Sequence, residues 1–225
     1  MREWEVYEES VRGFFGELGL PSLRGKAVRG ARGEHRVDVL VEFERFGVKQ
    51  TWVVECKCWK TRVQKANVLT LQEVVDDIGA DRSFLLSESG FQSGAVTAAR
   101  NSNVTLSNLS DLRENAAADL NEQRWNVLMR RQVALREWNI ETFVPKGATR
   151  SIGLRADRWE DLLYVTAQLG MLEGAFQRSH AGAFPVIYGI GRDDKPLRAK
   201  TMEDFLDGAA RSLDEIEQIV REFSG

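Results

Sequence analysis

Two alternating stretches joined by a short turn constrain the fold of this chain more than any other feature. In "RVDVLVEF" (36–43) the apolar residues fall on every second position, and "QTWVVECKCW" (50–59) follows after the turn "ERFGVK". Side chains two positions apart share one face of a strand. The pattern therefore predicts a β-hairpin whose first strand buries Val37, Val39, Val41 and Phe43.

The second strand carries an acid and a base on one face. Glu55 and Lys57 are two residues apart, so both point away from Val54, Cys56 and Cys58, which we expect on the buried face. With the turn at Phe46-Gly47, Asp38 lies opposite Glu55, with Cβ atoms about 5 Å apart. Like charges placed in this way destabilise a sheet unless a divalent cation binds between them. Lys57 could then hold a water or a phosphate oxygen.

Two flanking helices add polar residues at the edges of their apolar stripes. Residues 3–18 and 65–79 show the three- and four-residue spacing of amphipathic helices. Glu8 lies at the edge of the first stripe, whereas Glu9 lies well outside it. Gln72 holds the same edge position on the second helix. Glu8 is therefore a candidate third acid of the site, although a solvated surface acid remains an alternative for Glu8 and a capping or surface role for Gln72.

The elements around the hairpin predict an α/β domain. The stretches "SFLLS" (83–87) and "NVTLSNL" (103–109) read as strands, with a helix over "AVTAARN" (95–101) between them. This mixed sheet flanked by helices ends near residue 112, which gives a first domain of residues 1–112. A mainly helical region of unknown role follows over 113–225, with helices over 114–138, 157–178 and 201–223, a loop at Pro145 and Gly147, and a strand at "FPVIYGIG" (184–191).

Composition narrows the classes of function. The net charge is −3 over 225 residues, so attraction to nucleic acid must come from a local patch. No apolar run approaches the 18 residues of a membrane-spanning helix, and we expect no membrane partner. Two cysteines are too few for a disulfide framework, which favours a cytoplasmic location. The last helix is acidic and amphipathic, and it packs either on the core or on a second subunit in a homodimer.

The hairpin motif and its neighbours resemble a known nuclease family. Asp38, Glu55 and Lys57 form the pattern D-x(16)-E-x-K across the hairpin. Together with "GEHRVDVLVEF", "WVVECKCWK" and "DIGADRSFLLSESGFQSGAVTAAR", it resembles the Mrr-type restriction endonuclease branch of the PD-(D/E)xK superfamily, over residues 4–112. The resemblance implies a restriction-endonuclease-like core with Asp38 and Glu55 as ligands of Mg²⁺ or Mn²⁺ and Lys57 as catalytic lysine. Glu8 would match its first-helix acid and Gln72 its second-helix glutamine.

A basic segment precedes the strand of Asp38. The stretch "LRGKAVRGARGEHR" (23–36) has one acid and no clear periodicity, and we expect a flexible arm that contacts phosphates. A plain solvated loop is the alternative. The basic residues of this arm are Arg24, Lys26, Arg29, Arg32 and Arg36.

The sequence thus predicts a metal-dependent endonuclease that hydrolyses phosphodiester bonds, with DNA as the substrate implied by the resemblance and defence against foreign or modified DNA as its setting. A second hypothesis is a non-catalytic nucleic-acid-binding or scaffold protein that retains the nuclease fold. A third is that Glu55 and Lys57 form only a structural ion pair. Intact Asp38, Glu55 and Lys57 favour the first, because a site without turnover has no reason to hold like charges together.

Overall fold

The chain divides into two compact units. The computed structural model describes residues 2–143 and 159–224, and its contacts separate an N-terminal unit, residues 1–120, from a C-terminal unit, residues 121–225. Each unit has its own buried apolar cluster or clusters. The predicted loop at Pro145 and Gly147, and the predicted start of a helix at residue 157, lie outside the described residues.

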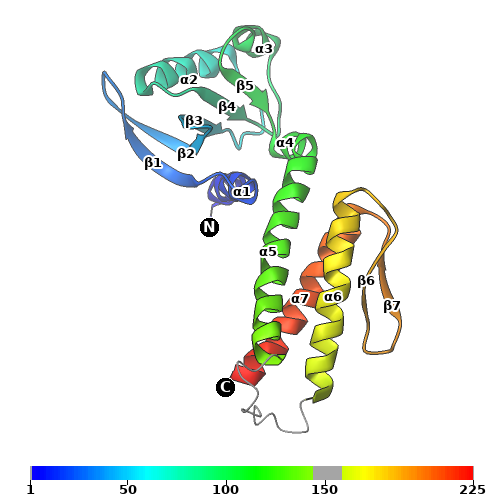
Figure 1. Ribbon diagram of the computed structural model, residues 1–225. Helices are drawn as coiled ribbons and strands as arrows, with labels where there is room; N and C mark the ends of the chain where they lie inside the picture. The colour runs from blue at the N-terminus through cyan, green and yellow to red at the C-terminus, as the bar shows by residue number, and fades with distance from the viewer. Residues whose placement is uncertain (1, 144–158, 225) are drawn as a thin grey trace. The chain divides into compact units, whose positions relative to one another are not determined.

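A mixed five-stranded sheet forms the centre of the N-terminal unit (Figure 1). Its strands lie in the order β1 (Ser22–Arg29), β2 (Glu34–Arg45), β3 (Val48–Cys56), β4 (Arg82–Leu86) and β5 (Val104–Ser107). The pairs β1–β2 and β2–β3 are antiparallel, and the pairs β3–β4 and β4–β5 are parallel. The predicted turn joins β2 to β3: Phe46 and Gly47 both have positive φ, 56° and 75°, as a two-residue hairpin turn requires.

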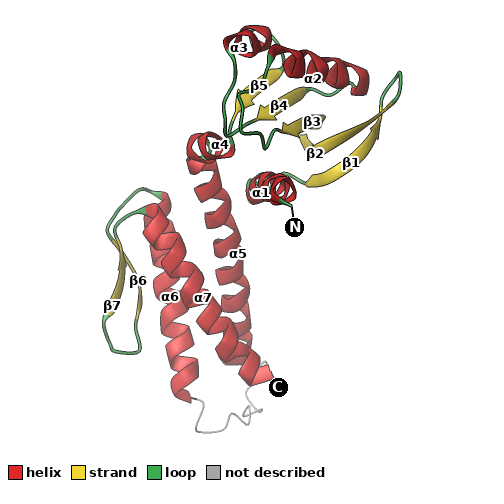
Figure 2. Ribbon diagram, turned by 180° about the vertical axis from the view of Figure 1, so that it is seen from behind, coloured by secondary structure: helices red, strands yellow, loops and turns green. Residues whose placement is uncertain are grey.

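Helices cover both faces of this sheet (Figures 1 and 2). On one face, Val11, Phe14 and Phe15 of α1 (Glu3–Glu17) belong to the same buried cluster as Val39 and Val41 of β2. The opposite face is covered by α2 (Lys65–Ile78) and α3 (Ser93–Ala99). Both crossovers between parallel strands contain a helix, which is the usual way to join such strands. The predicted α/β class and its helix positions are confirmed.

The basic segment is a strand, which corrects the prediction of a flexible arm. Residues 22–29 form β1, which pairs with β2 from Ser22–Val41 to Arg29–Glu34. As an edge strand, β1 has only half-buried or exposed residues, so it lacks the alternation that marks a strand in sequence. Gly25 has a φ of +63° and lies between the ladder pairs Arg24–Val39 and Lys26–Val37.

The N-terminal unit continues through α4 (Leu109–Asn115) to Leu120. Leu109, Leu112, Ala116 and Leu120 pack against the apolar cluster under α1. The contacts end the unit at Leu120. The boundary predicted from the sequence, residue 112, lies eight residues earlier.

In its described residues, the C-terminal unit contains two long helices, most of a third that begins in the N-terminal unit, and a β-hairpin. They are α5 (Ala117–Phe143), α6 (Trp159–His180), α7 (Met202–Ser224), β6 (Val186–Ile190) and β7 (Pro196–Ala199). Phe176 of α6 and Phe205 of α7 pack edge to face at the centre of its core, with ring centroids 5.0 Å apart. The mainly helical character and the strand at β6 agree with the prediction. The sequence missed β7, because its four residues include a proline and are too few for an alternation to be recognised. Among the described residues, no helix combines the length and the apolar character that crossing a membrane requires.

Candidate active site

The register of the hairpin places Asp38 and Glu55 side by side, directly after the last pair of the β2–β3 ladder. The β2–β3 ladder runs from Arg45–Val48 to Val39–Val54, so the next position on each strand is Asp38 and Glu55. Here the backbone ladder gives way to a side chain: Cys56 N–H donates to Asp38 Oδ2 at 2.8 Å. Asp38 is thereby fixed at the point where β2 and β3 separate, and its carboxylate takes the place of a backbone carbonyl.

Lys57 forms an ion pair with Glu55. Its Nζ donates to Glu55 Oε1, and both side chains are largely buried, with 18% and 27% of their surface exposed. Burial raises the pKa of the Glu55 carboxyl, and the charge of Asp38 raises it further, while Lys57 opposes both effects. The lysine therefore offsets only part of the electrostatic cost of holding the two carboxylates together.

Glu8 joins the two strand acids from α1. It is 8% exposed, whereas Glu9 pairs with Arg12 at the surface. Burial raises the pKa of Glu8, and the charge of Asp38 is the second cause. Arg24 Nη1 lies 3.2 Å from Glu8 Oε2 and acts in the opposite direction. The stripe-edge position predicted from the sequence thus places Glu8 near the other acids, not at the solvated surface.

Cys56 marks the centre of this group. Burial raises the pKa of its thiol, and Asp38, Glu8 and Glu55 raise it further in that order. The three carboxylates Asp38, Glu8 and Glu55 thus all act on the same thiol, that of Cys56 in β3. Cys58 is exposed, which corrects the prediction that both cysteines lie on the buried face. The reason is that β3 ends at Cys56, so the alternation of the strand does not extend to residue 58.

The chemistry of these donors fits a hard cation such as Mg²⁺. Carboxylate oxygens are its preferred protein ligands, and it commonly binds one or two carboxylates plus waters and substrate phosphates. Asp38 Oδ1 and Glu55 Oε2 accept no hydrogen bond from a described residue. In the described parts of the chain, no group of three or more His, Cys, Asp or Glu residues is arranged to hold a metal ion. The fit therefore concerns a cation held by the Asp38–Glu55 pair, with the remaining ligands from water and substrate.

Gln72 has a different partner from the acids. Its Nε2 donates to the carbonyl oxygen of Ala98 at 3.3 Å, which links α2 to α3. No hydrogen bond joins Gln72 to Asp38, Glu55 or Lys57 within the described residues. The side chain predicted for the site thus ties two helices together in this structure.

The predicted basic residues fall into two groups. Arg24 pairs with Glu8 and Glu9, and Arg32 pairs with Asp77 at 2.8 Å. The other three, Lys26, Arg29 and Arg36, make no ion pair with a described residue. Among the five, the cationic heads of this second group are the ones without an acidic partner in the described part of the chain.

Sequence reasoning missed Asp77 and the loop after Lys57. Asp77, on α2, accepts hydrogen bonds from the Arg32 backbone N–H and from Arg32 Nε, and lies 2.7 Å from His35 Nε2. It holds the β1–β2 turn against the end of α2, which no local pattern indicates. The loop "KCWKTRVQ" (57–64) carries three cations and no acid directly after the strand of the site, and this charge run was a usable signal.

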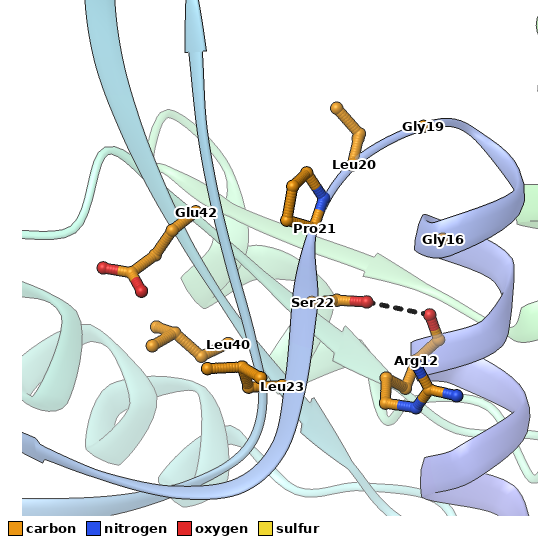
Figure 3. Close-up of a pocket in the computed structure, with 9 residues that line it drawn as sticks. All are labelled: Arg12, Gly16, Gly19, Leu20, Pro21, Ser22, Leu23, Leu40 and Glu42. Atoms are coloured by element: carbon orange, nitrogen blue, oxygen red, sulfur yellow. Dashed lines mark hydrogen bonds between the residues drawn. The ribbon is translucent and has the colours of Figure 1, made fainter.

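An open pocket lies beside the C-terminal end of α1 (Figure 3). Ser22 Oγ donates to the carbonyl oxygen of Arg12 beside it, at 2.9 Å. None of the five predicted catalytic residues contributes to the pocket. Its lining residues are Arg12, Gly16, Gly19, Leu20, Pro21, Ser22, Leu23, Leu40 and Glu42.

An α/β domain with two acids and a lysine where the ladder between two neighbouring strands ends is typical of a restriction-endonuclease-like nuclease. The family model for the Mrr catalytic domain, described as a restriction endonuclease, matches residues 2–115, just over half of the chain. The chain therefore belongs to this restriction endonuclease family. No curated protein matches it. A similar solved chain is the crystal structure of protein of unknown function AF1548, with 14% sequence identity, a TM-score of 0.42, and coverage of 96% of this chain and 99% of that one.

Proposed function

We propose that this chain is a metal-dependent endonuclease that hydrolyses phosphodiester bonds in DNA. The observation that carries the proposal is the Asp38–Glu55 pair where the β2–β3 ladder ends, with Lys57 bonded to Glu55, inside the nuclease family domain. Buried like charges are costly for folding alone, and perturbed acids gathered at one place are typical of functional sites. The name of the family supports DNA as the substrate and defence against foreign or modified DNA as the setting.

Each residue has a chemical task in this proposal. Bound Mg²⁺ or Mn²⁺ would polarise the scissile phosphate and lower the pKa of a water molecule. Asp38 and Glu55 would supply the carboxylate ligands for this cation, and the Cys56 N–H bond fixes the orientation of Asp38. Lys57 would turn its ammonium from Glu55 toward a phosphate oxygen and stabilise the negative charge that develops during attack. Water would add to phosphorus, and the bond from phosphorus to one ester oxygen would break.

Glu8 completes the acidic group. Burial and then the charge of Asp38 raise the pKa of its carboxyl, which would accept a hydrogen bond from a metal-bound water. Arg24 holds the carboxylate through one oxygen. We assign Glu8 a role in orienting water, and Gln72 a supporting role through the link between α2 and α3.

The non-catalytic hypothesis makes a different prediction about Lys57. A non-catalytic scaffold would require its basic surface to bind nucleic acid but would not require Lys57, since many cations contribute to phosphate binding. Incubation of supercoiled plasmid with the protein, with and without Mg²⁺ or Mn²⁺, separates the two. We expect nicking only with the cation, and its absence under all metal conditions would contradict the proposal.

The matched pair Lys57→Ala and Lys49→Ala tests the site itself. Both lysines belong to the β3 region, but Lys49 is exposed beside the β2–β3 turn. Loss of an electrostatic group of this kind lowers kcat by about 100-fold to 1000-fold. We expect this loss for Lys57→Ala alone, with DNA binding retained and the melting temperature lowered, because Glu55 loses its counter-ion. Nicking by Lys57→Ala at the wild-type rate would exclude this site as the catalytic one.

A further inference from the structure

The loop between β3 and α2 is the basic surface that directly adjoins the carboxylates. This segment, the Trp59 loop, comprises residues 57–64 and starts with Lys57 itself. It adds Lys60 and Arg62, both exposed, and Lys65 follows at the start of α2. None of these three makes an ion pair with a described residue, in contrast to Arg24 and Arg32 of the basic segment. Their charges are available to phosphate groups.

Trp59 is an exposed aromatic residue at the centre of this surface. The residue is 45% exposed, comparable to Trp4 at 39% and Trp159 at 46%, and it adjoins Lys57 of the proposed site. Lys57 Nζ lies 5.1 Å from the centroid of its ring, which is a cation–π distance. The indole therefore stands immediately beside the ammonium that the proposed reaction uses, with much of its surface open to solvent.

The Trp59 loop is held in place by the turn that follows β4. Ser89 Oγ donates to the carbonyl oxygen of Trp59. Val63 N–H donates to the Gly90 carbonyl oxygen at 3.0 Å, and Gln92 N–H donates to the Val63 carbonyl oxygen at 3.0 Å. Before the ring, the Lys57 N–H donates to the Leu86 carbonyl oxygen at 2.8 Å. The backbone is thus held before, at and after Trp59, so the indole is presented on an ordered loop.

An exposed indole among cations is the arrangement that proteins use to bind unpaired bases. Aromatic side chains stack on base faces while neighbouring cations neutralise the backbone. In an intact duplex the base faces are covered by their neighbours, and only an unpaired or extruded base offers one. Phosphate binding alone would need Lys60 and Arg62 but no exposed tryptophan.

We propose that Trp59 stacks on an unpaired base of the strand whose phosphate lies at Asp38 and Glu55, with Lys60 and Arg62 on the adjoining phosphates. The inference rests on the proposed nuclease function for the location of the phosphate. It defines the substrate class more narrowly: nucleic acid with an unpaired base next to the cleaved bond, such as a single strand, a bulge or a mismatch. A fully paired duplex lacks the face that the indole contacts.

Binding of fluorescent oligonucleotides to the full chain tests this proposal. The probes are a fully paired duplex, the same duplex with one unpaired base, and the single strand, each measured by anisotropy in Ca²⁺. The variants are Trp59→Ala, Trp59→Phe and Phe46→Ala. Phe46 is 96% exposed at the β2–β3 turn, about 26 Å along the strand from Asp38 at a rise of ~3.3 Å per residue, and it also lies beside a cation, Arg45.

We expect Trp59→Ala to weaken binding of the unpaired-base probes by about 5-fold to 150-fold, the range of one lost stacking contact. Binding of the paired duplex should change by less than about 2-fold, Trp59→Phe should retain most of the affinity, and Phe46→Ala should match wild type. Equal loss on all three probes, or no loss, would overturn the proposal. A Trp59→Ala variant that only cleaves more slowly, with unchanged affinities, would assign Trp59 to positioning Lys57 and would overturn it equally.

The two proposals fail in distinguishable ways. Cleavage of the same probes by the wild type in Mg²⁺ tests the nuclease function, while the Ca²⁺ measurements test stacking. A wild type that binds with the expected dependence on Trp59 and an unpaired base but never cleaves would refute only the nuclease function. A wild type that cleaves all probes alike, with affinities independent of Trp59, would refute only the stacking proposal.

Discussion

Two groups of buried acids in the N-terminal unit differ in how their charge is compensated. Asp77 has a side chain that is 2% exposed, and it bonds to Arg32 and His35. These bonds, with Arg32 as the larger contribution, lower its pKa to about 2. Glu8 and Glu55 are also largely buried, yet burial and the charge of Asp38 raise their pKa values. The surroundings of Asp77 stabilise its ionised form, whereas those of Glu8 and Glu55 disfavour the ionised form.

The direction of the pKa shift distinguishes an acid with a structural role, Asp77, from the acids of the candidate site. Asp77 satisfies the β1–β2 turn, and its cations come from the chain itself. Burial and the charge of Asp38 raise the pKa values of Glu8 and Glu55, and their ion pairs with Arg24 and Lys57 offset only part of these effects. A sequence that only had to fold would gain by replacing one of these acids with a neutral residue. The uncompensated charge is the best indication that a cation from outside completes this group.

The largest expected effect comes from removing one charge of the acid pair without removing its hydrogen bond. Asp38→Asn keeps an oxygen that accepts from Cys56 N–H, so the fold should persist. We expect cleavage to fall by roughly 100-fold or more. The rise in melting temperature that Mn²⁺ gives the wild type by mass action should also disappear. Calorimetry and plasmid nicking measure the two effects.

Asp81→Asn is the matched control for this change. Asp81 Oδ2 accepts from another backbone N–H of β3, that of Thr51, at 2.7 Å. The two aspartates therefore have the same structural task on the same strand, but only Asp38 faces further acids. Equal loss of metal response in both variants would show that the effect comes from β3 and not from the acid pair.

The second prediction concerns stability without metal. Asp77→Asn should lower the melting temperature by several degrees, because Arg32 and His35 lose the charge that binds them. Glu55→Gln should leave it unchanged or raise it, because the variant removes one of two like charges beside Asp38. Thermal unfolding followed by circular dichroism in EDTA gives both values. A larger loss for Glu55→Gln than for Asp77→Asn would reverse the comparison and make the Glu55–Lys57 pair structural.

The acid pair could be predicted from sequence because it depends on local geometry. The alternation of Val37, Val39 and Val41 fixed the face, and the Phe46-Gly47 turn fixed the register. Both are properties of a few neighbouring residues. The edge position of Glu8 followed in the same way from the helical spacing of α1.

The contacts of Asp77 with Arg32 and His35 could not be predicted, because they join segments that are distant in the sequence. Arg32 and Asp77 are 45 positions apart, and nothing in either segment indicates the other. The strand β1 was missed for a related reason: its register comes from hydrogen bonds to β2, which leave no hydrophobic pattern in an exposed edge. Hydrophobic patterns indicate where apolar side chains are buried, whereas these contacts are made by polar side chains and by the backbone.

The third prediction uses pH to separate the two groups. Asp77 has a pKa of about 2 in the folded chain, against about 3.9 for an unperturbed aspartate. A lowered folded pKa stabilises the folded state above the unfolded value, and this contribution is lost as the pH falls from about 4 toward 2. Between those values the wild type should lose melting temperature more steeply than Asp77→Asn. Glu55 has a raised pKa, so its protonation favours the folded state, and Glu55→Gln should not flatten the profile. A flatter profile in Glu55→Gln would contradict the assignment.

The smallest expected effect compares two arginines of the basic segment. Arg29 makes no ion pair with a described residue, whereas Arg32 is paired with Asp77. Each phosphate neutralised on duplex DNA contributes about −0.9 to the slope of log K against log salt concentration. Arg29→Ala should therefore make the slope less steep by up to about 0.9. Arg32→Ala should change the slope less, because its charge is already shared with an acid, and should instead lower the melting temperature through loss of the Asp77 contact. Anisotropy titrations of one duplex at several salt concentrations, together with thermal unfolding, measure both quantities. A different outcome would be an equal change of slope in Arg32→Ala and Arg29→Ala, with an unchanged melting temperature in Arg32→Ala. This would show that the Arg32–Asp77 pair does not form in solution. Asp77 could then no longer serve as the example of an acid whose charge is compensated by the chain.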